Sequence, residues 1–181
     1  MNWNSLSDLT LVAQIIAGSN DRAFERLVRK YQSPIRRFFL NQTAGDEMLS
    51  DDLAQETFIL VYRKIQTFHQ LSSFRTWLFS IAYNVWLSHI RQTKAISELN
   101  EEVSDAHFEQ HQSTEIRLDL ASAMQILSDI ERSCVTLFYI EDLPADKVAE
   151  ITELPVGTVK SHVHRGKTKL AQYLRERGYH E

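Results

Sequence analysis

Apolar side chains recur at steps of three and four residues along most of this chain, which is the period of one face of an α-helix. The clearest case runs from Ser73 to about Gln92, and its stripe consists of Phe74, Leu78, Ile81, Ala82, Val85 and His89. Only five glycines and three prolines occur in 181 residues, which is few for the many turns of a β-sheet protein. The sequence therefore predicts an all-α protein.

The helical pattern is lost between residues 93 and 115, and the charge changes in the same place. Residues 92–119 carry 2 basic and 7 acidic groups, whereas the whole chain has a net charge of only −4. An acidic segment without periodicity is typical of a flexible linker. We therefore expect two small helical domains, residues 1–92 and 114–181, joined by a flexible acidic linker over residues 93–113.

Capping residues predict where the helices of the first domain begin. Ser7 and Gly18 bracket the first helix, and Asn20 is placed to cap the second. Ser33 followed by Pro34 fits the start of a further helix, because proline is favoured at the first helical position. Ser50 is expected to open the next helix. In the second domain, Asp129 is placed to cap the helix that holds Ile130, Cys134, Leu137 and Phe138.

The chain ends with two helical segments separated by the three-residue turn Glu153-Leu154-Pro155. The first covers Pro144–Thr152 and contains the small Ala149, where two helix backbones can approach closely. The second runs from Val156 to about Leu174. This arrangement is typical of a helix-turn-helix, whose second helix enters the major groove of DNA.

The second helix of this pair has one apolar side and one polar, basic side. Residues 156–177 hold six basic groups against the single acid Glu176. The side chains suited to base edges are Thr158, Ser161, Arg165 and Thr168. Those placed to meet the two phosphate backbones are Lys160, His164, Lys167 and Lys169. The alternative is a solvated basic face on a purely structural helix pair.

A helix expected from Ser50 to about residue 66 mixes polar groups with one apolar residue on its exposed side. That side consists of Asp52, Gln55, Glu56, Ile59 and Arg63. An apolar residue within a polar face often marks a protein contact. Because single exposed isoleucines are also common, the pattern alone leaves a docking site and a solvated face equally open.

The following helix carries an aromatic ring beside an amide, a hydroxyl and a cation. These residues are Trp77, Asn84, Ser88 and Arg91. Such a face suits single-stranded DNA, because bases stack on aromatic rings and the backbone attracts positive charge. Judged from the residues alone, the alternative that Trp77 packs at the edge of the core is favoured.

Other features argue against catalysis and against bound metals or cofactors. Cys134 is the only cysteine and is expected in the core between Ile130 and Leu137, so the chain forms no internal disulfide. The histidines lack a zinc-ligand pattern, and the chain has no phosphate loop or catalytic constellation. No apolar run approaches the roughly 20 residues of a membrane span. We expect a cytoplasmic protein that is not an enzyme, with no metal and no cofactor.

Three segments together resemble the sigma-70 family of RNA polymerase sigma factors. Asp52-Leu53-Ala54-Gln55-Glu56-Thr57-Phe58 and Ser73-Phe74-Arg75-Thr76-Trp77-Leu78-Phe79-Ser80-Ile81-Ala82-Tyr83-Asn84 look like region 2 of that family. Val156-Gly157-Thr158-Val159-Lys160-Ser161-His162-Val163-His164-Arg165 looks like region 4. With only these regions and a short linker, the chain is similar to the extracytoplasmic-function (group IV) subfamily. The resemblance covers roughly residues 8–175.

The resemblance implies a sigma factor that directs promoter recognition and transcription initiation. Its partners would be core RNA polymerase, through the β and β′ subunits, promoter DNA, and an anti-sigma factor. The residues implied at the β′ clamp helices are Asp52, Gln55, Glu56 and Ile59. The loop 67–73 and the helix 74–91 would open the −10 element and hold its single strand, with one base flipped into a protein pocket. The residues implied there are Arg75, Trp77, Asn84, Ser88 and Arg91. Those implied at the double-stranded −35 element are Thr158, Lys160, Ser161, His162, His164, Arg165, Lys167 and Lys169.

Several positions depart from the family pattern. Ser88 stands where aspartate is usual, His162 replaces an arginine, and Glu153 occupies a turn position that usually holds glycine. Gly166 lies within a helix, which costs about 1 kcal/mol relative to alanine. These departures leave the promoter sequence open. The alternative function, a stand-alone helix-turn-helix regulator, is disfavoured because no dimerisation helix is evident.

Overall fold

The computed structural model describes residues 3–18, 21–99 and 123–179, and the regular structure within these ranges is entirely helical. The all-α prediction is therefore confirmed. The elements in chain order are α1 (Trp3–Gly18), α2 (Asp21–Gln42), α3 (Glu47–Lys64), the 3-10 turn η1 (Ile65–Thr67), α4 (Phe74–Leu99), α6 (Asp129–Val135), the π-helical turn η2 (Thr136–Ile140), α7 (Ala145–Thr152) and α8 (Val156–Glu176). Most of the predicted linker lies outside the described residues.

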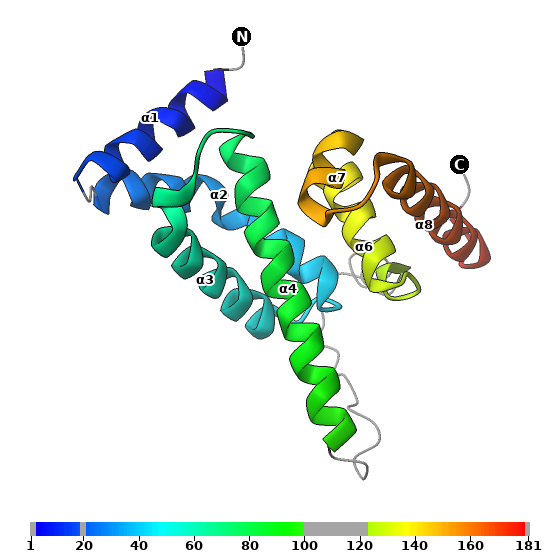
Figure 1. The fold of residues 1–181 in the computed structure, drawn as a ribbon. Coiled ribbons are helices and arrows are strands. Elements are labelled where there is room, and N and C mark those ends of the chain that lie inside the picture. The colour runs from blue at the N-terminus through cyan, green and yellow to red at the C-terminus, as the bar shows by residue number, and fades with distance from the viewer. Residues whose placement is uncertain (1–2, 19–20, 100–122, 180–181) are drawn as a thin grey trace.

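Helix α4 lies between two groups of helices, with α1–α3 on one side and α6–α8 on the other (Figure 1). The predicted stripe is buried at its apolar positions, and Leu78 and Ala82 are completely buried. Phe79, Tyr83 and Trp86, which the prediction left out, are buried as well. A helix that is packed on more than one side is apolar over more of its circumference than a surface helix.

The end of α4 and the start of the next predicted helix differ from expectation. α4 continues to Leu99 instead of ending near Gln92. Residues 93–99 contain Lys94, Ala95 and Glu98 but no glycine or proline, so good helix formers extend it without an apolar stripe. Its last turns project beyond both helix groups (Figure 1).

Pro34 does not begin a helix, contrary to the prediction. α2 continues through it from Asp21 to Gln42. The buried stripe of α2 passes the proline without interruption and consists of Ala23, Leu27, Tyr31, Ile35, Phe38, Phe39 and Gln42. Burial of several large side chains on both sides of Pro34 outweighs the roughly 3 kcal/mol that an interior proline costs a helix.

Three predicted helix starts are displaced by a few residues. α1 begins at Trp3, ahead of the predicted cap Ser7. α3 begins at Glu47, because the side chain of Asp46 accepts a hydrogen bond from the Leu49 amide at 2.9 Å. Ser50 is instead buried and shares a 2.8 Å hydrogen bond with Thr43. α6 is capped by Ser128, which forms a reciprocal capping box with Glu131, and not by Asp129.

The helix-turn-helix is confirmed. α7 and α8 flank the turn of Glu153, Leu154 and Pro155, and the inward-facing Val148, Ile151, Val159 and Val163 are buried. Glu153 has φ of 57°, a left-handed conformation in which glycine is favoured. The departure from the family pattern at this position therefore places a strained residue in the turn.

The N-terminal part, residues 3–99, and the C-terminal part, residues 123–179, share one continuous apolar core. Polar contacts join them too. The guanidinium of Arg132 donates to the Gln42 carbonyl at 3.0 Å, and the Ser133 hydroxyl donates to the Gln42 side-chain oxygen at 3.2 Å. The sequence did not predict this closed arrangement of the two parts.

Candidate nucleic-acid and protein interfaces

The polar side of α8 faces solvent. Ser161, Arg165 and Thr168 are exposed and Thr158 is half-buried. The hydroxyl of Ser161 donates to the Gly157 carbonyl at 2.9 Å, and that of Thr168 donates to the His164 carbonyl at 3.0 Å. Each hydroxyl oxygen keeps acceptor capacity, so these side chains can accept hydrogen bonds from base amino groups.

Two cations of α8 are oriented by one buried carboxylate. Glu131, at the start of α6, lies 2.7 Å from the Lys169 ammonium and 3.6 Å from the Arg165 guanidinium. Burial raises the pKa of Glu131, but hydrogen bonds from Lys169 and Ser128 outweigh it and hold the pKa below its ordinary value. Glu131 therefore stays ionised at neutral pH and fixes both cations at the edge of the recognition face.

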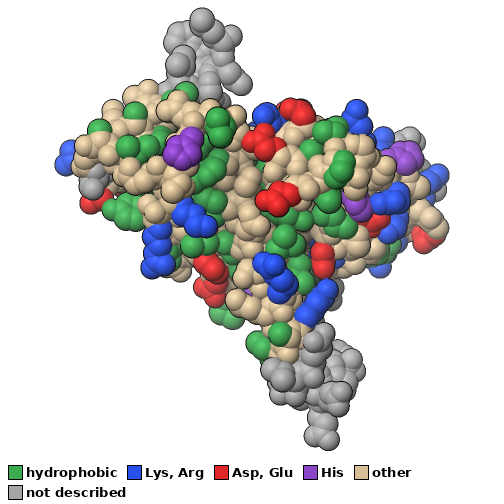
Figure 2. Space-filling model, viewed as in Figure 1, with side chains coloured by type: hydrophobic (Ala, Val, Ile, Leu, Met, Phe, Trp, Pro, Cys, Tyr) green, Lys and Arg blue, Asp and Glu red, His purple; other side chains and the backbone are tan. Residues whose placement is uncertain are grey.

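His162 is half-buried and contacts Arg165, whose guanidinium lies 3.0 Å from the imidazole Nδ1. Burial and the charge of Arg165 both lower the pKa of His162 below its ordinary value. The imidazole is therefore neutral at pH 7. The remaining predicted phosphate contacts, Lys160, His164 and Lys167, are exposed, and Figure 2 shows basic side chains and histidines gathered over the region of α8.

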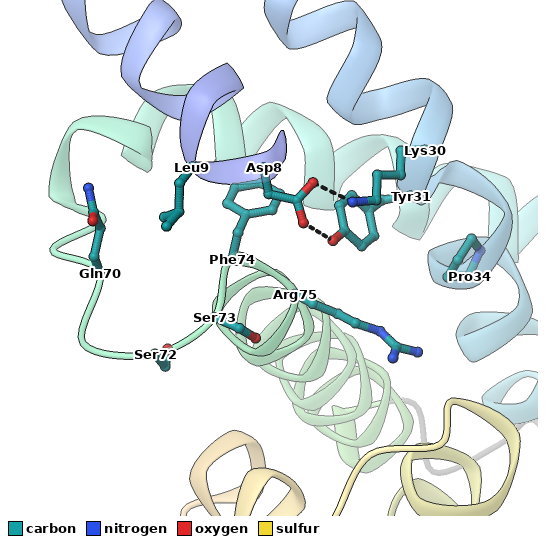
Figure 3. A pocket seen from close by; sticks show the side chains of 10 residues that line it. All are labelled: Asp8, Leu9, Lys30, Tyr31, Pro34, Gln70, Ser72, Ser73, Phe74 and Arg75. Carbon is teal, nitrogen blue, oxygen red and sulfur yellow. Dashed lines mark hydrogen bonds and ion pairs between the residues drawn. The ribbon is translucent and has the colours of Figure 1, made fainter. Parts of the chain in front are cut away.

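A cavity of about 410 Å³ lies at the start of α4. It is lined by Asp8, Leu9, Lys30, Tyr31, Pro34, Gln70, Ser72, Ser73, Phe74 and Arg75 (Figure 3). These residues come from α1, α2, the loop before α4 and the first turn of α4. The volume falls within the roughly 300–1,000 Å³ of small-ligand pockets, and the lining combines aromatic rings with donors and acceptors.

One wall of the cavity is fixed by a buried carboxylate. Asp8 accepts hydrogen bonds from the Lys30 ammonium at 2.5 Å and from the Tyr31 hydroxyl at 2.6 Å (Figure 3). Burial raises the pKa of Tyr31, and its hydrogen bond to Asp8 adds to this effect. Tyr31 is therefore a fixed hydrogen-bond donor, and α1 is tied to α2 beside the cavity.

The sequence missed most of the cavity residues, because they are distant in the chain and follow no shared period. The one sequence feature that could have indicated the cavity was the polar loop before α4. Within it Gln70 has φ of 58°, and the hydroxyl of Ser73 accepts a 3.1 Å hydrogen bond from the Thr76 amide. The helix start and the cavity lip are thus fixed by the same serine.

The predicted −10 residues are not all in one environment. Trp77 is half-buried and packs against Phe68 and Phe74, with ring centroids 5.3 Å and 5.8 Å away. This agrees with the packing interpretation of Trp77. Asn84 and Arg91 are exposed and Ser88 is half-buried. The Arg75 guanidinium donates hydrogen bonds to the backbone carbonyl and the carboxylate of Glu141, which lies in the C-terminal part.

An apolar groove of about 370 Å³ lies on the exposed side of α3, lined by Phe24, Val28, Gln55, Phe58, Ile59, Tyr62 and Arg63. Ile59 is 45% exposed and Tyr62 is 47% exposed. The Tyr62 ring packs edge-to-face on Phe24 at 4.9 Å, a pair that the sequence did not reveal. Asp52 and Glu56 are exposed on the same helix. An exposed apolar groove with a charged rim fits a protein partner.

Cys134 is completely buried, as predicted, and burial raises the pKa of its thiol to about 12. Such a thiol is unreactive at neutral pH. Among the residues that the structure describes, no cluster of three potential metal ligands is found. Within the same ranges, no helix has the length and apolarity needed to cross a membrane.

Comparison with known proteins finds two matching family regions and several similar relatives. Residues 27–96 match the family Sigma-70 region 2, and residues 117–170 match the family Sigma-70, region 4. The chain is 31% identical to the ECF RNA polymerase sigma factor SigW of Bacillus subtilis, over 91% of this chain and 95% of that protein. It is 29% identical to the ECF RNA polymerase sigma-E factor of Haemophilus influenzae, over 90% and 92% of the two chains.

Two solved structures share the fold. CnrH in complex with the cytosolic domain of CnrY is 26% identical with a TM-score of 0.72, over 94% of this chain and 98% of that one. The sigma factor RpoE in complex with the anti-sigma factor NepR from Bartonella quintana has a TM-score of 0.73 at 24% identity, over 84% and 96%. The exposed recognition helix, the two matched regions and the near full-length relatives lead to one conclusion: this chain belongs to the extracytoplasmic-function (ECF) family of sigma-70 RNA polymerase sigma factors.

Proposed function

We propose that this sigma factor divides promoter recognition between two DNA surfaces, while a third surface holds RNA polymerase. The observation that carries the proposal is the exposed polar side of α8, presented by a confirmed helix-turn-helix. We propose that this side reads the −35 element as a duplex. Thr158, Ser161 and Arg165 would meet base edges, and the flanking cations would meet phosphates.

The cavity at the start of α4 is the proposed site for one unstacked base of the −10 element. Its aromatic and hydrogen-bonding lining supports this role, because a flipped base needs a π-surface and partners for its edge. The exposed Asn84 and Arg91 lie further along α4, where the single strand would continue. Trp77 supports the cavity wall through Phe68 and Phe74, and so acts as a positioning residue.

The apolar groove on α3 is the proposed contact with the β′ clamp helices. Gln55 and Ile59 line this groove, and the exposed Asp52 and Glu56 lie on the same helix. Phe24 and Tyr62 extend the predicted contact by one aromatic pair. An Ile59→Asp substitution should weaken binding to core polymerase strongly, because it places a charge in the apolar centre of the interface. Gln66→Asp, on the exposed η1 turn, is the matched control.

The domain limits predicted from the sequence are retained as part of the proposal, with residues 1–92 and 114–181 joined by the acidic segment 93–113. The chain would act in the cytoplasm beside RNA polymerase and would catalyse no reaction of its own. Its relatives are named as sigma factors, which are initiation factors. Regulation by an anti-sigma factor is supported by the similar RpoE, whose structure contains the anti-sigma factor NepR.

Transcription in vitro tests the proposal. The purified chain is added to bacterial core polymerase on genomic fragments, and the start sites are mapped. We expect initiation at a limited set of promoters that share −35 and −10 sequences, and loss of initiation with Ile59→Asp. Tight binding to one operator without core polymerase, with no initiation, would contradict the proposal and support the stand-alone regulator.

A further inference from the structure

We propose that Arg37 and Arg75 form a phosphate-binding pair for the −10 strand, and that Glu141 occupies this pair when the two parts of the molecule are closed. The inference rests on the proposed function, because it assigns the −10 strand to the start of α4. It adds Arg37, which no sequence pattern indicated, and a competitor for both arginines.

The two arginines converge on one carboxylate from the other part of the chain. Arg37 of α2 donates to Glu141 Oε1 at 2.8 Å, and Arg75 of α4 lies 3.3 Å from Oε2. Arg75 also donates to the backbone carbonyl of Glu141. The Glu141 side chain has no exposed surface, whereas the side chains of Arg37 and Arg75 are 45% and 35% exposed.

This site is adjacent to the proposed base cavity. Arg75 is one of its lining residues, and in Figure 3 its guanidinium extends to the opposite side from Leu9 and Gln70. A strand whose base enters the cavity would therefore bring a backbone phosphate close to Arg75. Guanidinium groups bind phosphate and carboxylate oxygens with the same forked geometry, so Glu141 occupies the position that the phosphate would take.

Competition follows from the burial of Glu141. A buried carboxylate is tolerated only while cations compensate its charge. If a phosphate engages Arg37 and Arg75, Glu141 loses its partners and the closed arrangement becomes unfavourable. The coupling is reciprocal, so closing the two parts weakens binding of the −10 strand by the same factor.

The test measures binding of a short fluorescent single-stranded DNA with the non-template −10 sequence of a promoter at which the holoenzyme initiates. Fluorescence anisotropy compares the full chain with Glu141→Gln, which removes the charge but keeps the shape. We expect roughly tenfold tighter binding by the variant, within the roughly 5–150-fold range of typical couplings.

Two further substitutions, each in the Glu141→Gln background, test whether Arg37 binds a phosphate of the strand. Arg37→Gln should lower the affinity and reduce the salt slope by about 0.7, as expected for one lost phosphate contact on a single strand. Arg36→Gln is the matched control, because Arg36 pairs with Asp51 and Glu47 on α3 and not with Glu141. It should change neither quantity.

Closure is followed by energy transfer between dyes at Met48→Cys and Ala171→Cys, both exposed positions. Cys134 is buried and should stay unlabelled. We expect Glu141→Gln and added −10 strand each to lower the transfer.

The inference is overturned if Glu141→Gln does not tighten binding of the −10 strand, or if the tighter binding persists undiminished after Arg37→Gln. If no promoter supports initiation by the wild-type holoenzyme, it is the proposed function that fails; initiation without an effect of Glu141→Gln would refute this inference alone.

Discussion

The arginines of the two proposed DNA surfaces are held by carboxylates from different places. Arg165 on α8 is held by Glu131, which belongs to the same C-terminal part. Arg75 at the start of α4 is held by Glu141, which belongs to the opposite part. Separation of the two parts would leave the α8 surface unchanged but would release Arg75. The −35 surface is thus formed within one part, whereas the −10 surface depends on how the two parts are arranged.

The largest expected effect concerns the packing of α8 on α6, which forms the −35 surface within the C-terminal part alone. A Cβ added at Gly166 would lie 2.5 Å from the Cγ2 methyl of Val135, a buried and stiff side chain on α6. Gly166→Ala should therefore lower the free energy of unfolding by about 3 kcal/mol, the upper end for overpacking. Chemical denaturation followed by circular dichroism measures this loss.

Gly157→Ala is its control. Gly157 lies in the same helix with nothing within 4 Å of the added Cβ, so this change should not destabilise the protein. Equal stability of the two variants would show that α8 is not fixed on α6 at Gly166.

The next effect concerns reading of the −35 element. Arg165→Ala should weaken recognition of the −35 duplex by about 2 kcal/mol, roughly 30-fold, because a bidentate hydrogen-bonded contact from the guanidinium to a base is lost. Footprinting of the holoenzyme on a promoter measures the change. Arg175→Ala, an exposed arginine near the end of α8, should have little effect. A similar loss with both variants would show that Arg165 contributes only its positive charge and does not read a base.

A smaller effect concerns Glu131, whose pKa is lowered in the folded chain. A carboxyl group with a lowered pKa stabilises the fold above its ordinary pKa, and this stabilisation is lost as the pH falls through the folded pKa. The wild type should exceed Glu131→Gln in stability by about 1 kcal/mol at pH 7, the size of a helix-cap contribution. This difference should shrink on acidification below about pH 4.5.

Unfolding measured at several pH values tests this prediction. Glu56→Gln, at an exposed position, serves as the control variant. A stability difference that grows on acidification would contradict the assigned sign.

The smallest effect concerns the rim of α8. Lys167→Ala should weaken binding of all duplexes about equally and reduce the salt slope by about one, because an exposed lysine contacts phosphate and not a base. Titrations of holoenzyme with promoter and non-promoter duplexes at several salt concentrations measure both quantities. A loss confined to one −35 sequence would show instead that Lys167 reads a base.

The features that the sequence predicted correctly depend on residues that lie close together in the chain. The helix-turn-helix follows from a three-residue turn between two helical segments, and the exposed side of α3 follows from residues one to four positions apart. Family resemblance indicated Arg75. Pro34 misled the prediction, because local preference at one residue competes with burial along the whole of α2.

The remaining features depend on residues that are distant in the sequence. Glu141 and Arg37 are 104 positions apart, and no period connects them. The cavity at the start of α4 combines residues from two helices and a loop with one turn of a third helix. Gly166 looked like a weakness of α8 until its neighbour Val135 was known. Such contacts are set by tertiary packing, so only the folded chain reveals them.

The division between the two DNA surfaces is tested most directly by base preference. Holoenzymes containing the wild type, Arg165→Ala or Gln70→Ala transcribe a promoter library randomised at the −35 and −10 elements, and the transcripts are sequenced. We expect Arg165→Ala to relax preference at −35 alone and Gln70→Ala to relax preference at −10 alone. The proposed division between the two DNA surfaces is refuted if both substitutions alter the same element, or if each alters the element assigned to the other.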